Sequence, residues 1–169
     1  MNRNNILIRK IRPEELDRVA QLLKAAYQQY EKFMPADAWQ FYLSDIVDVR
    51  GRMAESELLV AVVNGKLAGT VTLYLGGRNR TEGNWPAGWA MARLLGVDPE
   101  YRNKGIGHAL IDECIRRCRD SGIKTIGLHT VSFMEVAKSM YDRMGFQCVP
   151  EFDLHPMSDV VIMAYKLDV

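Results

Sequence analysis

The sequence has few cysteines, nearly balanced charges and no long apolar run, and each of these absences argues against a class of protein. Three cysteines, an odd number with no C-x-x-C pair, argue against a disulfide framework or a zinc knuckle. A formal net charge of +1 gives no electrostatic basis for binding nucleic acid or an anionic membrane. No apolar run reaches membrane-spanning length, and the N-terminus lacks the apolar region of a secretory signal. We therefore expect a cytoplasmic protein without a metal.

Internal repeats, low-complexity tracts and linkers are also missing, so residues 1–169 are predicted to form a single domain. Apolar residues make up 48% of the chain and charged residues 25%, a balance typical of globular proteins. A chain of this length can bury a full hydrophobic core without disulfides.

The predicted order of elements is strand, two helices, three strands, helix, strand, helix and two strands. Asn64-Gly65 joins two of the strands and is a strong signal for a two-residue hairpin turn. The predicted strands are 6–11, 57–63, 66–75, 89–97, 124–130, 146–152 and 160–167, and the predicted helices are one starting at Pro13, then 36–53, 104–120 and 135–144. This order predicts an α/β fold with a mixed sheet.

The most informative segment is the tight turn Arg102-Asn103-Lys104-Gly105-Ile106-Gly107, which lies between a strand and a helix. The first N–H groups of a helix have no partners within the helix, and the helix dipole makes that end positive. Glycines let a ligand approach the backbone, and Arg102 and Lys104 add positive charge. The turn is therefore suited to a phosphate or pyrophosphate.

Two nucleotide-binding motifs do not fit the spacing of this turn. A Rossmann fingerprint needs a third glycine, where position 110 is Leu. A Walker A loop needs Gly-Lys-Ser/Thr, which does not occur. The alternative that Gly105 and Gly107 only allow close packing is weakened by the two cations beside them.

Two motifs together resemble the GNAT N-acetyltransferase superfamily. Arg102-x-x-Gly105-x-Gly107, preceded by Leu95-x-Val97-x-Pro99-x-Tyr101, resembles the acetyl-CoA signature of that family. The later stretch Ala137-Lys-Ser-Met-Tyr141-Asp-Arg-Met-Gly145-Phe146 resembles its second motif. The resemblance implies a single-domain fold with a central mixed, mostly antiparallel sheet and about four helices on both faces.

The resemblance also implies a cofactor and roles for individual residues. The cofactor is acetyl-CoA, with pantetheine paired to the backbone of Leu95 and Val97 and pyrophosphate in the turn. Tyr141 matches the position of the usual general acid. The implied cofactor-binding residues are Leu95, Gly96, Val97, Arg102, Asn103, Lys104, Gly105, Ile106, Gly107, His108, Ser132 and Met134.

Two departures from the family pattern concern the reaction centre. Many members carry Asn where this chain has Met134, whose side chain cannot replace an amide hydrogen bond, although Ser132 offers a partial substitute. Trp89-Ala-Met-Ala-Arg93 lacks the glutamate that often precedes the turn. Glu82, His129 and His155 remain as candidate general bases. The alternative for His129 is a strand-end histidine that pairs with backbone. The alternative for Glu82 is a solvated charge in a loop.

Other side chains have competing interpretations. Cys114 and Cys118 are predicted to lie on the apolar face of one helix and to pack in the core, and Cys148 has no partners for nucleophilic catalysis. An aromatic group at the join of the first two helices is consistent with core, with a homodimer surface or with a substrate wall. It comprises Tyr27, Tyr30, Phe33, Met34, Trp39, Phe41 and Tyr42.

Three functions fit these observations. The first is acetylation of an amine of a small molecule or peptide by direct attack on acetyl-CoA. The second is a non-catalytic acyl-CoA-binding or sensor domain, favoured by Met134 and the missing glutamate but not by Tyr141. The third is a nucleotide-binding module, in which ATP or NAD would displace CoA. The sequence does not identify the acceptor.

Overall fold

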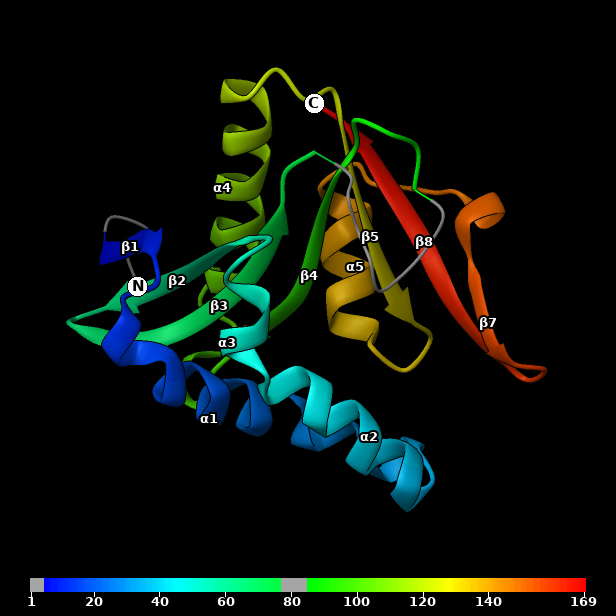
Figure 1. Ribbon diagram of the computed structural model, residues 1–169, viewed down its shortest axis with the longest axis horizontal. Coiled ribbons are helices and arrows are strands. Elements are labelled where there is room, and N and C mark those ends of the chain that lie inside the picture. Colours follow the sequence, from blue (N-terminus) through cyan, green and yellow to red (C-terminus); the bar gives the residue numbers. More distant parts are fainter. Residues whose placement is uncertain (1–4, 77–84) are drawn as a thin grey trace. The chain divides into compact units, whose positions relative to one another are not determined.

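The computed structural model of the protein describes residues 5–76 and 85–169, which include eight strands and five α-helices (Figure 1). The strands are β1 (Ile6–Lys10), β2 (Glu57–Val63), β3 (Lys66–Tyr74), β4 (Ala90–Val97), β5 (Thr125–Val131), β6 (Gln147–Cys148), β7 (Leu154–Met157) and β8 (Val160–Asp168). The helices are α1 (Leu16–Tyr27), α2 (Ala36–Val47), α3 (Val49–Arg52), α4 (Ile106–Asp120) and α5 (Glu135–Arg143).

The strands are hydrogen-bonded in the order β1-β2-β3-β4-β5-β8-β6, and β7 also pairs with β8. Antiparallel pairs join β1 to β2, β2 to β3, and β8 to each of β5, β6 and β7. Strands β4 and β5 pair in parallel, with Ala90 opposite Ile126 and Met91 opposite Gly127. The predicted α/β class and the mixed, mostly antiparallel sheet are confirmed, with five described α-helices where about four were expected.

The chain packs as two compact units, to which β4 and α4 both contribute. The first unit is Met1–Leu73 with Leu94–Glu113, and the second is Tyr74–Arg93 with Cys114–Val169. No helix in residues 5–76 and 85–169 is long and apolar enough to cross a bilayer.

In the first unit, helices approach the sheet closely at two glycines. A Cβ placed on Gly96 of β4 would lie 3.0 Å from Leu23 of α1, and one on Gly69 of β3 would lie 2.8 Å from Ile106 of α4. Both glycines therefore let a helix pack directly on strand backbone. The apolar face of α1 is buried, through Leu16, Val19, Leu22, Leu23, Ala26 and Tyr27.

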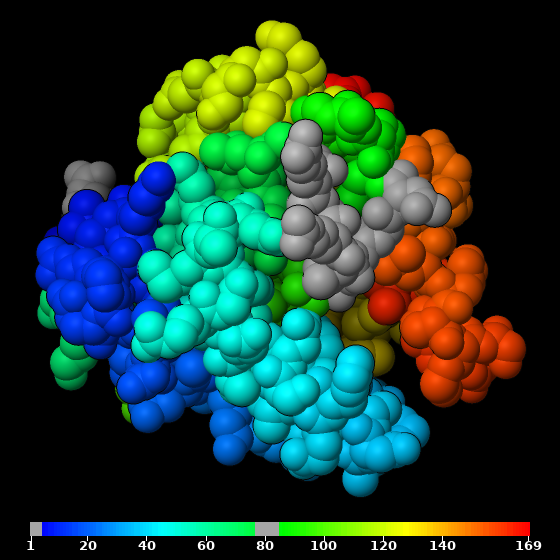
Figure 2. Space-filling model, viewed as in Figure 1, coloured from blue at the N-terminus to red at the C-terminus, as the bar shows by residue number. Residues whose placement is uncertain are grey.

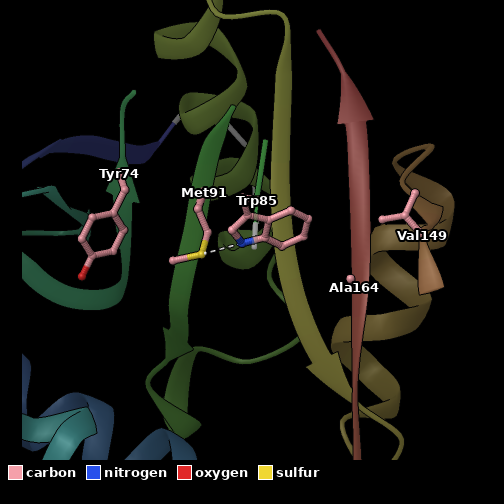
Figure 3. Packing of buried hydrophobic residues seen from close by; sticks show 5 residues of the cluster. All are labelled: Tyr74, Trp85, Met91, Val149 and Ala164. Atoms are coloured by element: carbon pink, nitrogen blue, oxygen red, sulfur yellow. Dashed lines mark hydrogen bonds between the residues drawn. The ribbon is translucent and has the colours of Figure 1, made fainter. Parts of the chain in front are cut away.

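In the second unit, the core is built around Trp85 (Figure 3). Its indole N–H lies 3.2 Å from the sulfur of Met91, and its ring occupies the space that a side chain at position 127 would need. Tyr74, Val149 and Ala164 complete this buried cluster.

Several predicted elements agree closely with the structure. The Asn64-Gly65 turn is present, with both residues at positive φ (50° and 77°), as a type I′ hairpin requires. Gly122 and Gly145 follow α4 and α5 at φ 72° and 89°, as expected for glycines that end helices.

Two predicted elements are corrected. The helix expected over 36–53 divides into α2 and α3, because Asp48 leaves helical geometry (ψ 63°) and its carboxylate accepts the N–H of Gly51 to begin a new helix. The strand expected over 146–152 is limited to β6, since Pro150 begins a short 3-10 helix. Strand β7 was not predicted.

Candidate functional site

The turn before α4 has the geometry of an anion-binding helix start. Asn103 and Gly105 both take positive φ, 60° and 78°, so the chain reverses sharply before Ile106. The N–H of Ala109 donates to the carbonyl of Gly105 at 3.0 Å, which is the first bond of the helix. The N–H groups of Ile106, Gly107 and His108 precede that bond and point out of the helix end. The first turn contains no acidic residue, so no carboxylate there offsets the positive dipole end.

The charged side chains of this turn already have partners within the protein. Nη2 of Arg102 donates to the carbonyl of Ala26 at 3.1 Å. Nζ of Lys104 donates to the carbonyl of Glu100 at 3.1 Å and lies 5.1 Å from the ring centroid of Tyr101. An anion at this turn would therefore be held chiefly by backbone N–H groups, with the two cations in support.

His108, which follows the turn, contacts an acidic side chain along α4. Its Nδ1 lies 2.8 Å from Oδ2 of Asp112, one helical turn later. Both side chains are substantially exposed, 42% and 58%, so water screens the pair and its contribution to stability is small.

Strand β4 has an irregular backbone just before the predicted pantetheine positions. Leu94 has φ 53° in the middle of the strand, a conformation that costs a non-glycine residue about 1 kcal/mol and is typical of a bulge. The N–H of Asp98 donates to the carbonyl of Ala68, the β3 residue beside it, at 2.9 Å. Because backbone groups alternate in direction along a strand, those of Leu95 and Val97 lie on the edge of β4 that faces away from β3.

The remaining predicted residues lie in the second unit. Met134 occupies the N-cap position of α5 (φ −89°, ψ 58°), where its side chain makes no capping hydrogen bond. Ser132 is exposed, two residues earlier. Tyr141, on α5, is buried with 5% exposure, and its ring centroid lies 5.5 Å from that of Phe146.

The candidate general bases differ in their surroundings. Nε2 of His129 lies 3.1 Å from the carbonyl oxygen of Phe152, and the imidazole centroid is 4.7 Å from that of Trp85. This is the backbone pairing that was the alternative to a catalytic role. His155 is exposed on β7. Glu82 lies outside the described residues.

The predicted aromatic group at the end of α1 divides between core and surface. The ring of Tyr27 packs edge-on against Tyr30 and Tyr42, at 5.8 and 6.1 Å between centroids, and Trp39 is 1% exposed. Phe41, in contrast, is 79% exposed on α2, which forms the light-blue surface in Figure 2. Burial raises the pKa of Tyr30, and the nearby positive charge of Arg102 partly opposes this.

The cysteines match the prediction of core packing. Cys114 and Cys118 are completely buried on α4, and burial raises the pKa of Cys118 to about 11, which disfavours the reactive thiolate. Cys148 is exposed on β6. Across the part of the chain that the structure describes, no group of three or more His, Cys, Asp or Glu residues is placed to hold a metal ion.

Comparison with known proteins identifies the family. The model of the acetyltransferase (GNAT) family matches residues 16–146. A mycothiol acetyltransferase from Propionibacterium freudenreichii is 36% identical over 107 residues, which are 60% of this chain and 33% of that protein. The chain thus spans about a third of the length of this curated relative.

Solved structures share the fold at low identity. PaiA N-acetyltransferase from Thermoplasma acidophilum, in complex with coenzyme A, has a TM-score of 0.70 at 19% identity, covering 97% of this chain and 99% of that one. A GNAT family acetyltransferase from Brucella melitensis, in complex with acetyl-CoA, has a TM-score of 0.63 at 22% identity, covering 96% and 87%.

The family match covers well over half of the chain, and the chain therefore belongs to the GNAT acetyltransferase family. Acetyl-CoA is the acetyl donor of that family, so the cofactor expected from the sequence is confirmed at the level of the family. The roles of the individual site residues stay predictions.

Proposed function

We propose that this chain is an N-acetyltransferase that binds acetyl-CoA at the turn before α4 and acetylates an amine of a small molecule or peptide. The observation that carries the proposal is the start of α4. The N–H groups of Ile106, Gly107 and His108 precede the first bond of the helix, Asn103 and Gly105 take positive φ, and the first turn has no acidic residue. The similarity to a mycothiol acetyltransferase supports a small-molecule acceptor.

Bound acetyl-CoA supplies an acetyl group activated as a thioester, which the acceptor nitrogen attacks directly. Tyr141 is proposed to protonate the departing sulfur, since its reference pKa of about 10 suits a general acid for a thiolate. The N–H of Val97, on the edge of β4 away from β3, is proposed to donate to the carbonyl oxygen as it gains negative charge. An alkylamine is neutral in only about one molecule in 10^3 at pH 7, so a base or a less basic acceptor is needed.

The test is thiol release from acetyl-CoA in the presence of a panel of amino sugars, amino acids, polyamines and peptide N-termini. We expect release that depends on the amine and acetylation of nitrogen in the product by mass spectrometry. Tight CoA binding without amine-dependent release across the panel would instead support the acyl-CoA sensor. Displacement of CoA by ATP or NAD at similar concentrations would support the nucleotide-binding alternative.

A further inference from the structure

The last turn of α1 is tied to the predicted cofactor site by two hydrogen bonds within the first unit. The hydroxyl of Tyr27 donates to the carbonyl of Leu95 at 3.0 Å, across 68 positions of sequence. Nη2 of Arg102 donates to the carbonyl of Ala26, the residue before Tyr27, at 3.1 Å. One helical turn therefore contacts both β4 and the turn before α4.

The Leu95 carbonyl that accepts this hydroxyl lies on a particular edge of β4. Asp98 donates to Ala68, so alternation along β4 directs the N–H and carbonyl of Leu95 to the edge away from β3. That edge is the one to which pantetheine is assigned. A carbonyl oxygen accepts two hydrogen bonds, so the Tyr27 hydroxyl occupies one site and leaves a second for a ligand amide.

The segment that Tyr27 holds has a reason to need support. Leu94, immediately before Leu95, takes the strained φ of 53°, and such conformations persist only where surrounding contacts impose them. Tyr27 itself is well fixed, because it is 7% exposed and packed edge-on against Tyr30 and Tyr42. The hydroxyl is thus a rigid donor to the backbone that follows a strained residue.

We propose that Tyr27 is a positioning residue for the acetyl donor, whose hydroxyl holds the Leu95 carbonyl and so presents the β4 edge to the pantetheine arm. This role rests on the proposed function. Because Tyr27 also belongs to the aromatic group at the end of α1, the same residue links that group to the donor site.

The experiment compares Tyr27→Phe with the wild-type protein by calorimetric titration of CoA and of 3′-phosphoadenosine 5′-diphosphate, which is CoA without its pantetheine arm. Losing one neutral hydrogen bond predicts about fivefold weaker binding of CoA. Binding of the truncated ligand should change by less than about twofold, since that ligand reaches only the turn. In turnover, KM for acetyl-CoA should rise more than kcat falls.

Tyr165→Phe is the matched control, because Tyr165 is a buried tyrosine of the second unit with 4% exposure. It should leave both affinities unchanged. Tyr27→Phe could lower the melting temperature but leave CoA affinity unchanged, or it could weaken the binding of both ligands equally. Either result would show that the hydroxyl is only structural, and the proposal would be overturned. Wild-type protein that binds no CoA would overturn the proposed function as well, so the two failures are distinguishable.

Discussion

The indole of Trp85 lies directly against the backbone of Gly127: a Cβ added at position 127 would come within 2.9 Å of the ring. The indole is held by its bond to the sulfur of Met91 and by ring contacts with Trp89 and Phe152, so it has little room to move. The strand β5 can therefore pass under the tryptophan only because residue 127 has no side chain.

Gly127→Ala is expected to destabilise the protein by about 1–3 kcal/mol through this overpacking. Chemical denaturation measures the effect. The variant Trp85→Leu is itself destabilised. In that background, the added cost of Gly127→Ala should be well below half of its cost in the wild-type protein. Equal costs in the two backgrounds would show that the contact with Trp85 is not the cause.

The N-terminus of α5 offers a stabilising substitution. Met134 stands at the N-cap with non-helical backbone angles and makes no capping hydrogen bond. Met134→Asn supplies an acceptor for the first N–H groups of α5 and is expected to add roughly 1 kcal/mol to the free energy of unfolding. Met134→Leu, which keeps the apolar character, is the control and should not stabilise. No gain with Asn would mean that these N–H groups already have an acceptor.

Stability should depend on pH through the ion pair that joins β1 to the segment before α1. Both nitrogens at the end of Arg9 bond the carboxylate of Glu15, at 2.6 and 2.8 Å, and these bonds hold the pKa of Glu15 below its ordinary value of 4.5. A lowered folded-state pKa gives stability that is full above the unfolded value and is lost as pH falls through the folded value. Glu15→Gln should thus cost about 1–2 kcal/mol at pH 7.

The check is the difference in unfolding free energy between wild type and Glu15→Gln, followed from pH 7 down to pH 3. The difference should stay constant from pH 7 to about pH 5. It should then decrease as the pH falls below the ordinary carboxyl pKa. A difference that does not change over this range would mean that the charge of Glu15 contributes nothing.

Binding at the turn should depend more on backbone access than on the lysine. Lys104 is engaged with Glu100 and Tyr101, whereas the N–H groups of the helix start are the proposed main donors to the ligand. Lys104→Ala is expected to weaken CoA binding by less than about fivefold, and Gly107→Trp by more than tenfold because the indole obstructs the turn. A larger loss of CoA affinity in Lys104→Ala than in Gly107→Trp would indicate that side chains, and not backbone N–H groups, hold the phosphate.

Tyr141→Phe should separate chemistry from binding. Removal of a general acid is expected to lower kcat by about 10²-fold or more while the Kd of CoA stays within about twofold. Steady-state kinetics and a CoA titration give the two values. Unchanged turnover would remove Tyr141 from the mechanism.

Local sequence signals predicted much of this fold. Asn64-Gly65 has the positive φ values that its predicted hairpin turn requires, and the helix start after Gly105 lies within two residues of its predicted place. These features depend on neighbours in sequence. The division of the second helix depends on the hydrogen bond between Asp48 and Gly51. These residues are three positions apart, a spacing that also occurs within a continuous helix.

The hydrogen bonds from the end of α1 to β4 and to the turn before α4 had no such local signal. Tyr27 and Leu95 are 68 positions apart, and Arg102 and Ala26 are 76 apart. Tyr27 was expected only as one aromatic residue among several, and Arg102 only as a phosphate ligand. The positive φ of Leu94 was likewise unpredictable, since leucine does not favour it.

A crystal structure of this chain with acetyl-CoA tests the central claim most directly. We predict pyrophosphate oxygens within hydrogen-bonding distance of the N–H groups of Ile106, Gly107 and His108, and pantetheine along the edge of β4 that carries Leu95 and Val97. A cofactor bound elsewhere, or no cofactor at saturating concentration, would contradict the account.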